Sequence, residues 1–93
     1  MSDVVAKVAK VEVAKAKIIA LWLHIWLKRI ARKYPLFFVK ILDDLELSEK
    51  QSKIMKYRYI NGMKFKQITN FVFMEERSVH RLHKQVIDKL INL

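Results

Sequence analysis

The chain has 93 residues, a length that fits one small domain or a small domain with an added arm. Its 19 lysines and arginines outnumber its 9 acidic residues, and the net charge of +10 indicates a polyanionic partner, either nucleic acid or an anionic membrane. The absence of cysteine excludes a disulfide framework, a thiolate zinc site and a cysteine nucleophile. One glycine and one proline leave little turn chemistry for sheets, and a 53% apolar content excludes a disordered basic tail, so we expect an all-α fold with a core.

Charge also indicates how the chain is organised. Residues 1–33 and 48–93 are basic, and residues 34–47 are acidic. We therefore predict an N-terminal helical arm over residues 1–46 and a helical module over residues 47–93. The most apolar stretch, residues 18–27, is shorter than the roughly 20 residues that span a bilayer and precedes no cleavage site, so we expect a cytoplasmic protein without a membrane anchor.

The first predicted element is a long amphipathic helix that continues to Lys33, where the dipeptide Tyr34-Pro35 ends it. One side of this helix is apolar, and we expect it to mediate assembly into a dimer or higher oligomer, or binding to RNA polymerase. Packing against the module's own core and anchoring at a membrane interface are the alternatives. The residues that we assign to this interface are Ile19, Trp22, Leu23, Trp26, Leu27 and Ile30, after a run that includes Val4, Val8 and Val11.

Shorter helices follow. Pro35 opens an apolar helix that ends at Asp43-Asp44. Ser48 and Gln51 have capping-box spacing, with Leu47 as a hydrophobic staple, and predict a helix over residues 49–60 that stops at Asn61-Gly62. A helix over residues 64–72, a turn at Phe73-Met74 and a last helix over residues 75–91 complete the pattern of a helix-turn-helix module.

The last helix has two unlike faces. Its apolar residues Val79, Leu82, Val86, Leu90 and Leu93 fall within one sector and predict the side that packs on the core, whereas Arg77, Arg81, Lys84 and Asp88 fall opposite. Such a basic ridge suits an element that enters the major groove of DNA. At the start of the preceding helix, Lys64, Lys66 and Gln67 are placed to clamp a phosphate.

The stretch KFKQITNFVFMEERSVHRLHKQVIDKL and the preceding LSEKQSKIMKYRYINGM resemble the promoter-reading C-terminal domain, region four, of bacterial sigma factors. Within that group they look most like small late-gene activators of the ArpU and RinA type from phages. The resemblance implies that Glu76, Arg77 and Arg81 contact bases and that Ser78 and His80 contact the DNA backbone. The sequence departs from the family pattern in three places, because Phe73 replaces a glycine in the turn, Glu75 replaces a Ser or Thr cap and Glu76 replaces an arginine.

We therefore expect a sequence-specific DNA-binding transcriptional regulator, encoded by a phage or mobile element, that binds double-stranded DNA and acts with host RNA polymerase in the bacterial cytoplasm. The alternative is a protein-binding module that occupies polymerase or another regulator, which the Glu75-Glu76 pair favours because two acids near DNA repel phosphate. We expect no enzymatic activity and no cofactor. His80 and His83 have metal-ligand spacing but lack a third ligand nearby, and His24 is interpreted as an interface residue.

Overall fold

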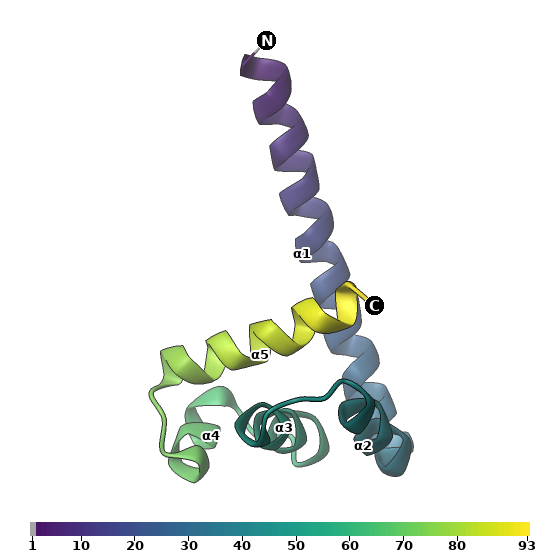
Figure 1. Cartoon of the computed structure of the whole chain (residues 1–93), viewed down its shortest axis with the longest axis vertical. Helices are drawn as coiled ribbons and strands as arrows, with labels where there is room; N and C mark the ends of the chain where they lie inside the picture. The colour runs from purple at the N-terminus through teal and green to yellow at the C-terminus, as the bar shows by residue number, and fades with distance from the viewer. Residues whose placement is uncertain (1) are drawn as a thin grey trace.

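A computed structural model describes the backbone of residues 2–93 and the side chains of residue 15 and residues 17–93. Every regular element in this part of the chain is helical, which confirms the predicted all-α class (Figure 1). The elements are α1 (Ser2–Lys33), α2 (Pro35–Asp44), α3 (Glu49–Met55), the π-helical segment η1 (Lys56–Ile60), α4 (Phe65–Val72) and α5 (Glu76–Ile91). The predicted arm residues Val4, Val8 and Val11 lie outside the described side chains.

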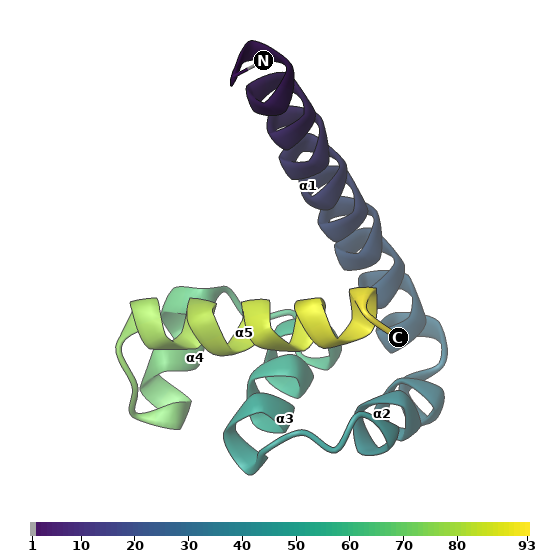
Figure 2. The ribbon, with the colours of Figure 1, turned by 45° about the horizontal axis from the view of Figure 1, so that its top comes forward.

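The helix α1 projects from a body formed by the other helices, and the molecule measures 48 × 29 × 21 Å (Figures 1 and 2). Its 32 residues make a helix about 48 Å long at roughly 1.5 Å per residue, which exceeds the reach of one small core. The helix ends where predicted, because Pro35 starts α2 and Tyr34, the residue before it, has left the helical region at φ −133° and ψ 66°. The chain then reverses, and α2 packs against the end of α1.

The joints of the second half also follow local chemistry. The backbone N–H of Gln51 donates to Ser48 Oγ at 3.2 Å, and the N–H of Ser48 donates to Gln51 Oε1 at 3.0 Å, which confirms the predicted capping box. Leu47, the predicted staple, packs against the core. Gly62 adopts a φ of +66°, a left-handed conformation that favours glycine, and ends this helical segment.

The predicted helix over residues 49–60 is not uniform. Regular α geometry ends at Met55, and the chain continues as η1, in which the N–H of Asn61 bonds to the carbonyl of Lys56 at 3.2 Å, five residues back. Packing explains the wider turn. It allows Tyr59 to enter the core while Tyr57 reaches α4, where its ring lies 5.4 Å from that of Phe71.

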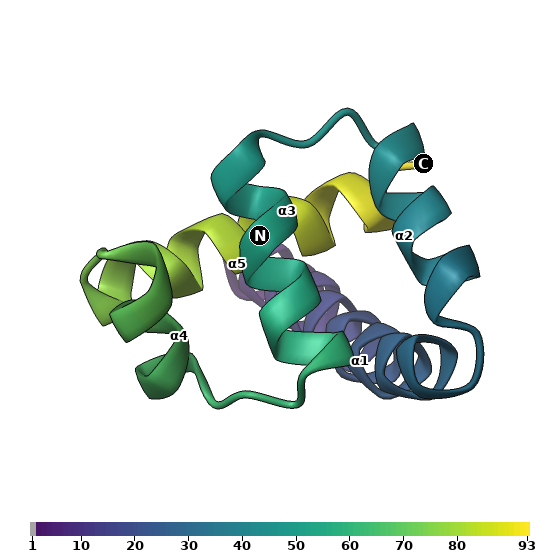
Figure 3. The same ribbon diagram turned by 90° about the horizontal axis from the view of Figure 1, so that it is seen from below.

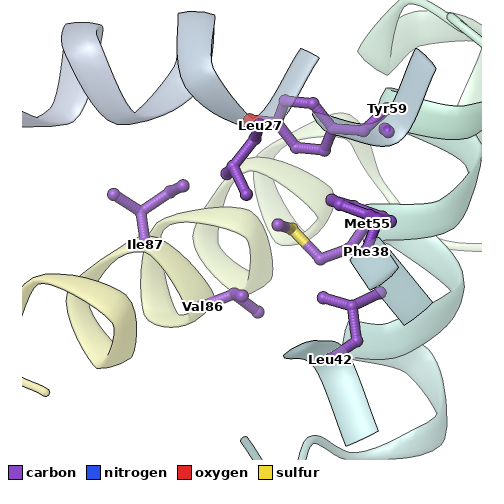
Figure 4. Packing of buried hydrophobic residues seen from close by; sticks show 8 residues of the cluster. Leu27, Phe38, Leu42, Met55, Tyr59, Val86 and Ile87 are labelled. Carbon is purple, nitrogen blue, oxygen red and sulfur yellow. The ribbon is translucent and has the colours of Figure 1, made fainter. Parts of the chain in front are cut away.

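The larger core cluster packs α1 and α2 against α3, η1 and α5 (Figure 4). Leu27 from α1, Phe38 from α2, Met55 from α3 and Val86 from α5 are all 0% exposed. The cluster also contains Ala31, Leu42, Tyr59 and Ile87. The last turns of the predicted arm, residues 1–46, therefore share a core with the predicted module, residues 47–93.

A second cluster holds α3, α4 and α5 together. It consists of the buried residues Ile54, Ile68, Val72 and Val79. Seen from below, α4 lies beside the first half of α5, whereas α1 and α2 lie towards the other half (Figure 3). The two clusters thus divide α5 along its length, and its N-terminal half is positioned by α3 and α4.

Among the described residues, no helix has the length and the apolar character needed to cross a membrane.

Candidate nucleic-acid interface

The predicted two-faced character of α5 is present in the structure. Val79 and Val86 are fully buried, whereas Arg77, Arg81 and Lys84 on the opposite side are exposed. The N-terminal half of α5, which carries the arginines, lies at the end of the body remote from α1 (Figures 1 and 2). The arm therefore leaves this basic face open to solvent.

Two residues at the C-terminal end of α5 differ from the predicted division of this helix into a core side and an exposed side. Leu93 is 87% exposed, because α5 ends at Ile91 and the last two residues extend beyond the packed turns. Ile87, which the prediction left out, is 6% exposed and packs in the larger cluster, because α1 covers that flank of α5. The buried sector of α5 is therefore wider than the sequence pattern indicates.

The start of α4 brings three of the predicted contact residues to the surface. Lys64, Lys66 and Gln67 are exposed. Gln67 Oε1 accepts the backbone N–H of Lys64 at 3.0 Å, so this side chain caps the start of α4. Phe65 connects this group to α5, because its ring centroid lies 4.2 Å from that of His80. The start of α4 thus contacts α5 at His80, within one turn of Arg77 and Arg81.

The beginning of α5 carries the acidic residues that depart from the sigma-factor pattern. Glu76 Oε1 lies 3.5 Å from His80 Nε2, and both side chains are about half exposed. Glu75 occupies the N-cap position without a side-chain cap bond, so its carboxylate does not replace the expected Ser or Thr function. Ser78 is half-buried, which makes it less available for a backbone contact than its exposed neighbours.

The turn between α4 and α5 contains a non-glycine residue, Phe73, in a left-handed backbone conformation. Phe73 has a φ of 54° and a ψ of 46°, in the left-handed region that glycine adopts more readily. Its side chain is 92% exposed, and that of Phe71 is 53% exposed. This end of the module therefore presents two aromatic side chains to solvent.

The predicted interface of α1 separates into an exposed part and a buried part. Ile19, Trp22 and Trp26 are 48%, 68% and 43% exposed, and so remain available to a partner. Leu27 is fully buried in the chain's own core, and the prediction that it contacts a partner is wrong because α2 and α5 already cover that turn. Leu23 and Ile30 are half-buried and pack against the same cluster.

Sequence reasoning missed a polar cluster that connects the arm to the body. The Tyr59 hydroxyl lies 2.8 Å from His24 Nδ1 on α1 and 2.8 Å from His83 Nε2 on α5. A phenol has one proton to donate, so with neutral imidazoles it donates to one histidine and accepts from the other. His24 thus has a contact within its own chain. Only the three-dimensional structure brings together residues so far apart in sequence.

Burial favours the neutral forms of the histidines in this cluster. Burial, together with the charges of His24, Arg58 and His80, lowers the pKa of His83 from 6.5 to about 4. Burial, with Lys28 and Arg58, also lowers the pKa of His24, and burial raises the pKa of Tyr59. Within the described residues, no group of three or more metal-ligating side chains surrounds His80 and His83.

Comparison of the chain with protein-family models, curated proteins and solved structures finds no match.

Proposed function

We propose that this chain is a small DNA-binding regulator whose α4 and α5 form a helix-turn-helix resembling sigma region four. The observation that carries the proposal is the exposed basic face of α5, formed by Arg77, Arg81 and Lys84 opposite buried Val79 and Val86. Arginine forks on an exposed helix face suit guanine edges and phosphates. In this arrangement Lys64, Lys66 and Gln67 contact the DNA backbone beside α5.

The acidic residues at the start of α5 are compatible with this function. Glu76 Oε1 lies 3.5 Å from His80 Nε2 on the next turn of α5, so the carboxylate has a polar neighbour on its own helix. The basic side chains Arg77, Arg81 and Lys84 exceed Glu76 and Asp88 in number on the exposed face. The face retains a net positive charge.

Duplex binding should be strongly salt-dependent. We expect a plot of log Kd against log salt concentration to have a slope of about 4 to 6 in magnitude, for five or six phosphate contacts.

Arg81→Ala should weaken the binding free energy by about 1–3 kcal/mol at a selected DNA sequence and relax the sequence preference there. Fluorescence anisotropy with random and selected duplexes measures both effects.

The matched control is the double variant Lys40→Gln/Lys50→Gln, which removes two exposed cations from α2 and α3. It should bind DNA much as the parent chain does. Affinity that does not change with salt, or an Arg81→Ala variant indistinguishable from the control, would contradict the proposal.

A protein-binding function is the second candidate, and the exposed side chains of Phe71 and Phe73 near the α4–α5 turn favour it. Exposed aromatic side chains suit a protein partner, because aromatic residues are enriched at protein interfaces. In that case the chain would bind RNA polymerase or another regulator through the α4–α5 turn. The absence of duplex binding by the parent chain, together with capture of purified polymerase, would select this function.

We also propose that α1 joins two copies of the chain. Ile18, Leu21 and Trp22 lie on one short stretch of α1, and their side chains are 55%, 60% and 68% exposed. Contiguous apolar surface of this kind marks an interaction site in proteins that are not embedded in a membrane. Because apolar side chains surround this part of α1, a second α1 is a chemically matched partner.

Light scattering at micromolar concentration should therefore report a mass above that of one 11.1 kDa chain. Trp22→Ala should shift the population towards single chains, because large aromatic residues dominate such interfaces. Lys17→Ala is the matched control, since it alters an exposed polar residue of the same helix. A single 11.1 kDa species for the parent chain would exclude the dimer.

A further inference from the structure

A basic groove lies between α1 and η1. It has a volume of about 530 Å³, and Lys28 and Arg32 line it on the α1 side. On the other side it is lined by Arg58 and by the turn that contains Asn61 and Gly62. The proposed DNA contacts of α4 and α5 do not include these residues.

The groove contains three cations and no carboxylate in its lining. Within the described part of the chain, the side-chain ion pairs are Lys53 with Glu49 and His80 with Glu76, so Lys28, Arg32 and Arg58 have no acidic partner there. Next to burial, which has the largest effect, the charges of Lys28 and Arg58 also lower the pKa of the nearby His24. Uncompensated cations around a concave surface attract an anion.

Arg58 is held in place at the edge of this groove. Its Nη1 donates to the carbonyl of Met63 at 3.0 Å, and its guanidinium lies 4.5 Å from the ring centroid of Phe65. Its Nε is buried without a hydrogen-bond partner among the described residues, which makes its charge poorly compensated. A guanidinium fixed in this way loses little conformational entropy when it binds a ligand.

The groove is also connected to the proposed DNA contacts. Arg58 stacks on Phe65, and Phe65 follows Lys64 in the chain and contacts His80 of α5. A path of contacts therefore leads from His80 of α5 through Phe65, at the start of α4, to Arg58 at the groove. A long polyanion can follow such a path.

We propose that the groove formed by Lys28, Arg32 and Arg58 binds phosphate groups and takes a phosphodiester of the DNA backbone as a second contact region. The choice of DNA as the source of the phosphate rests on the proposed function. The phosphate chemistry itself does not, because it follows from the three cations and the shape of the groove. A free phosphorylated molecule is the other source of the same chemistry.

Two measurements on the full chain test this site. In the first, inorganic pyrophosphate is titrated while the ring resonances of His24 and His83 are followed by NMR. We expect saturable changes and a rise in the pKa of His24 when the anion offsets the nearby positive charge. The double variant Lys28→Gln/Arg32→Gln should bind pyrophosphate more than about tenfold more weakly, because each charge-assisted contact contributes more than a neutral hydrogen bond.

The second measurement is the salt dependence of duplex binding. The same groove variant should lower the magnitude of the log-log slope by about 2, from the loss of two phosphate contacts. The control variant Lys40→Gln/Lys50→Gln has the same net charge and should leave both measurements nearly unchanged. Circular dichroism is the control for folding. We expect the variants to fold, because the substituted side chains are exposed.

The outcomes separate the two proposals. If the parent chain does not bind duplex DNA, but pyrophosphate binds and the groove variant loses it, the proposed function fails and the phosphate site stands. If pyrophosphate binding is lost while the duplex slope is unchanged, DNA is excluded as the source. If pyrophosphate binds the groove variant and the control equally, the phosphate site itself is overturned.

Discussion

Between pH 6.5 and pH 4, the free energy of unfolding should fall by up to about 3 kcal/mol because of His83 alone. The pKa of His83 is about 4 in the folded chain, whereas the ordinary pKa of a histidine side chain is 6.5. Above pH 6.5 the imidazole is neutral in both states, so its contribution to stability is fully present. As the pH decreases through this interval, the unfolded chain binds a proton that the folded chain does not, and stability is lost. Urea unfolding at closely spaced pH values measures the effect.

His83→Gln isolates the contribution of this residue. The variant keeps a side chain that can hydrogen-bond to the Tyr59 hydroxyl, but it has no group that titrates in this interval. Its stability should therefore depend less steeply on pH than that of the parent chain. His24→Gln should flatten the profile in the same direction, since the pKa of His24 is also lowered. Parallel profiles for the parent and His83→Gln would show that His83 is protonated equally in both states.

Leu27→Ala should destabilise the whole molecule by about 2–5 kcal/mol, the usual cost of removing a fully buried leucine side chain. Leu27 is 0% exposed and contacts a cluster that includes Phe38 from α2 and Val86 from α5. The cavity would therefore form where the arm, the linking helix and the last helix meet. In a domain of this size, each 1 kcal/mol corresponds to a decrease in Tm of about 4–8 °C.

Leu21→Ala is the matched control, because Leu21 lies on the same helix and is 60% exposed. At protein concentrations low enough to disfavour association, it should change the free energy of unfolding by less than about 0.5 kcal/mol. Thermal unfolding followed by circular dichroism compares the two variants. If Leu27→Ala unfolds α1 but leaves the Tm of the remaining helices unchanged, the shared core does not contribute to their stability.

Local sequence chemistry predicted the boundaries of the elements well. Pro35 restricts its own φ and that of the preceding residue, and Ser48 and Gln51 satisfy each other's backbone groups, so these signals act within a few residues. The exposure of Arg77 and Arg81 was equally predictable, because helical periodicity places them opposite Val79 and Val86. All of these features depend on neighbours in the sequence.

The features that the sequence did not reveal depend on contacts between distant segments. The π turn of η1 accommodates the insertion of Tyr59 between α1 and α5, and no local motif in the sequence marks that site. Leu27 continues the apolar face of α1, and periodicity cannot distinguish the turn that α2 and α5 cover from the turns that remain exposed. The groove beside Arg58 likewise requires α1 and η1 to be adjacent.

The attachment of α1 to the body would also set the geometry of an assembled pair. Its last turns are part of the core, and the chain's one glycine and one proline lie outside it, so the helix has no built-in hinge between its exposed apolar turns and the body. Two copies joined through their α1 helices would hold their α5 helices at a fixed separation and mutual orientation. Under the proposed DNA-binding function, such a pair would require two half-sites with one spacing and twofold symmetry. Inserting half a helical turn of DNA between them would place one half-site on the wrong side of the duplex.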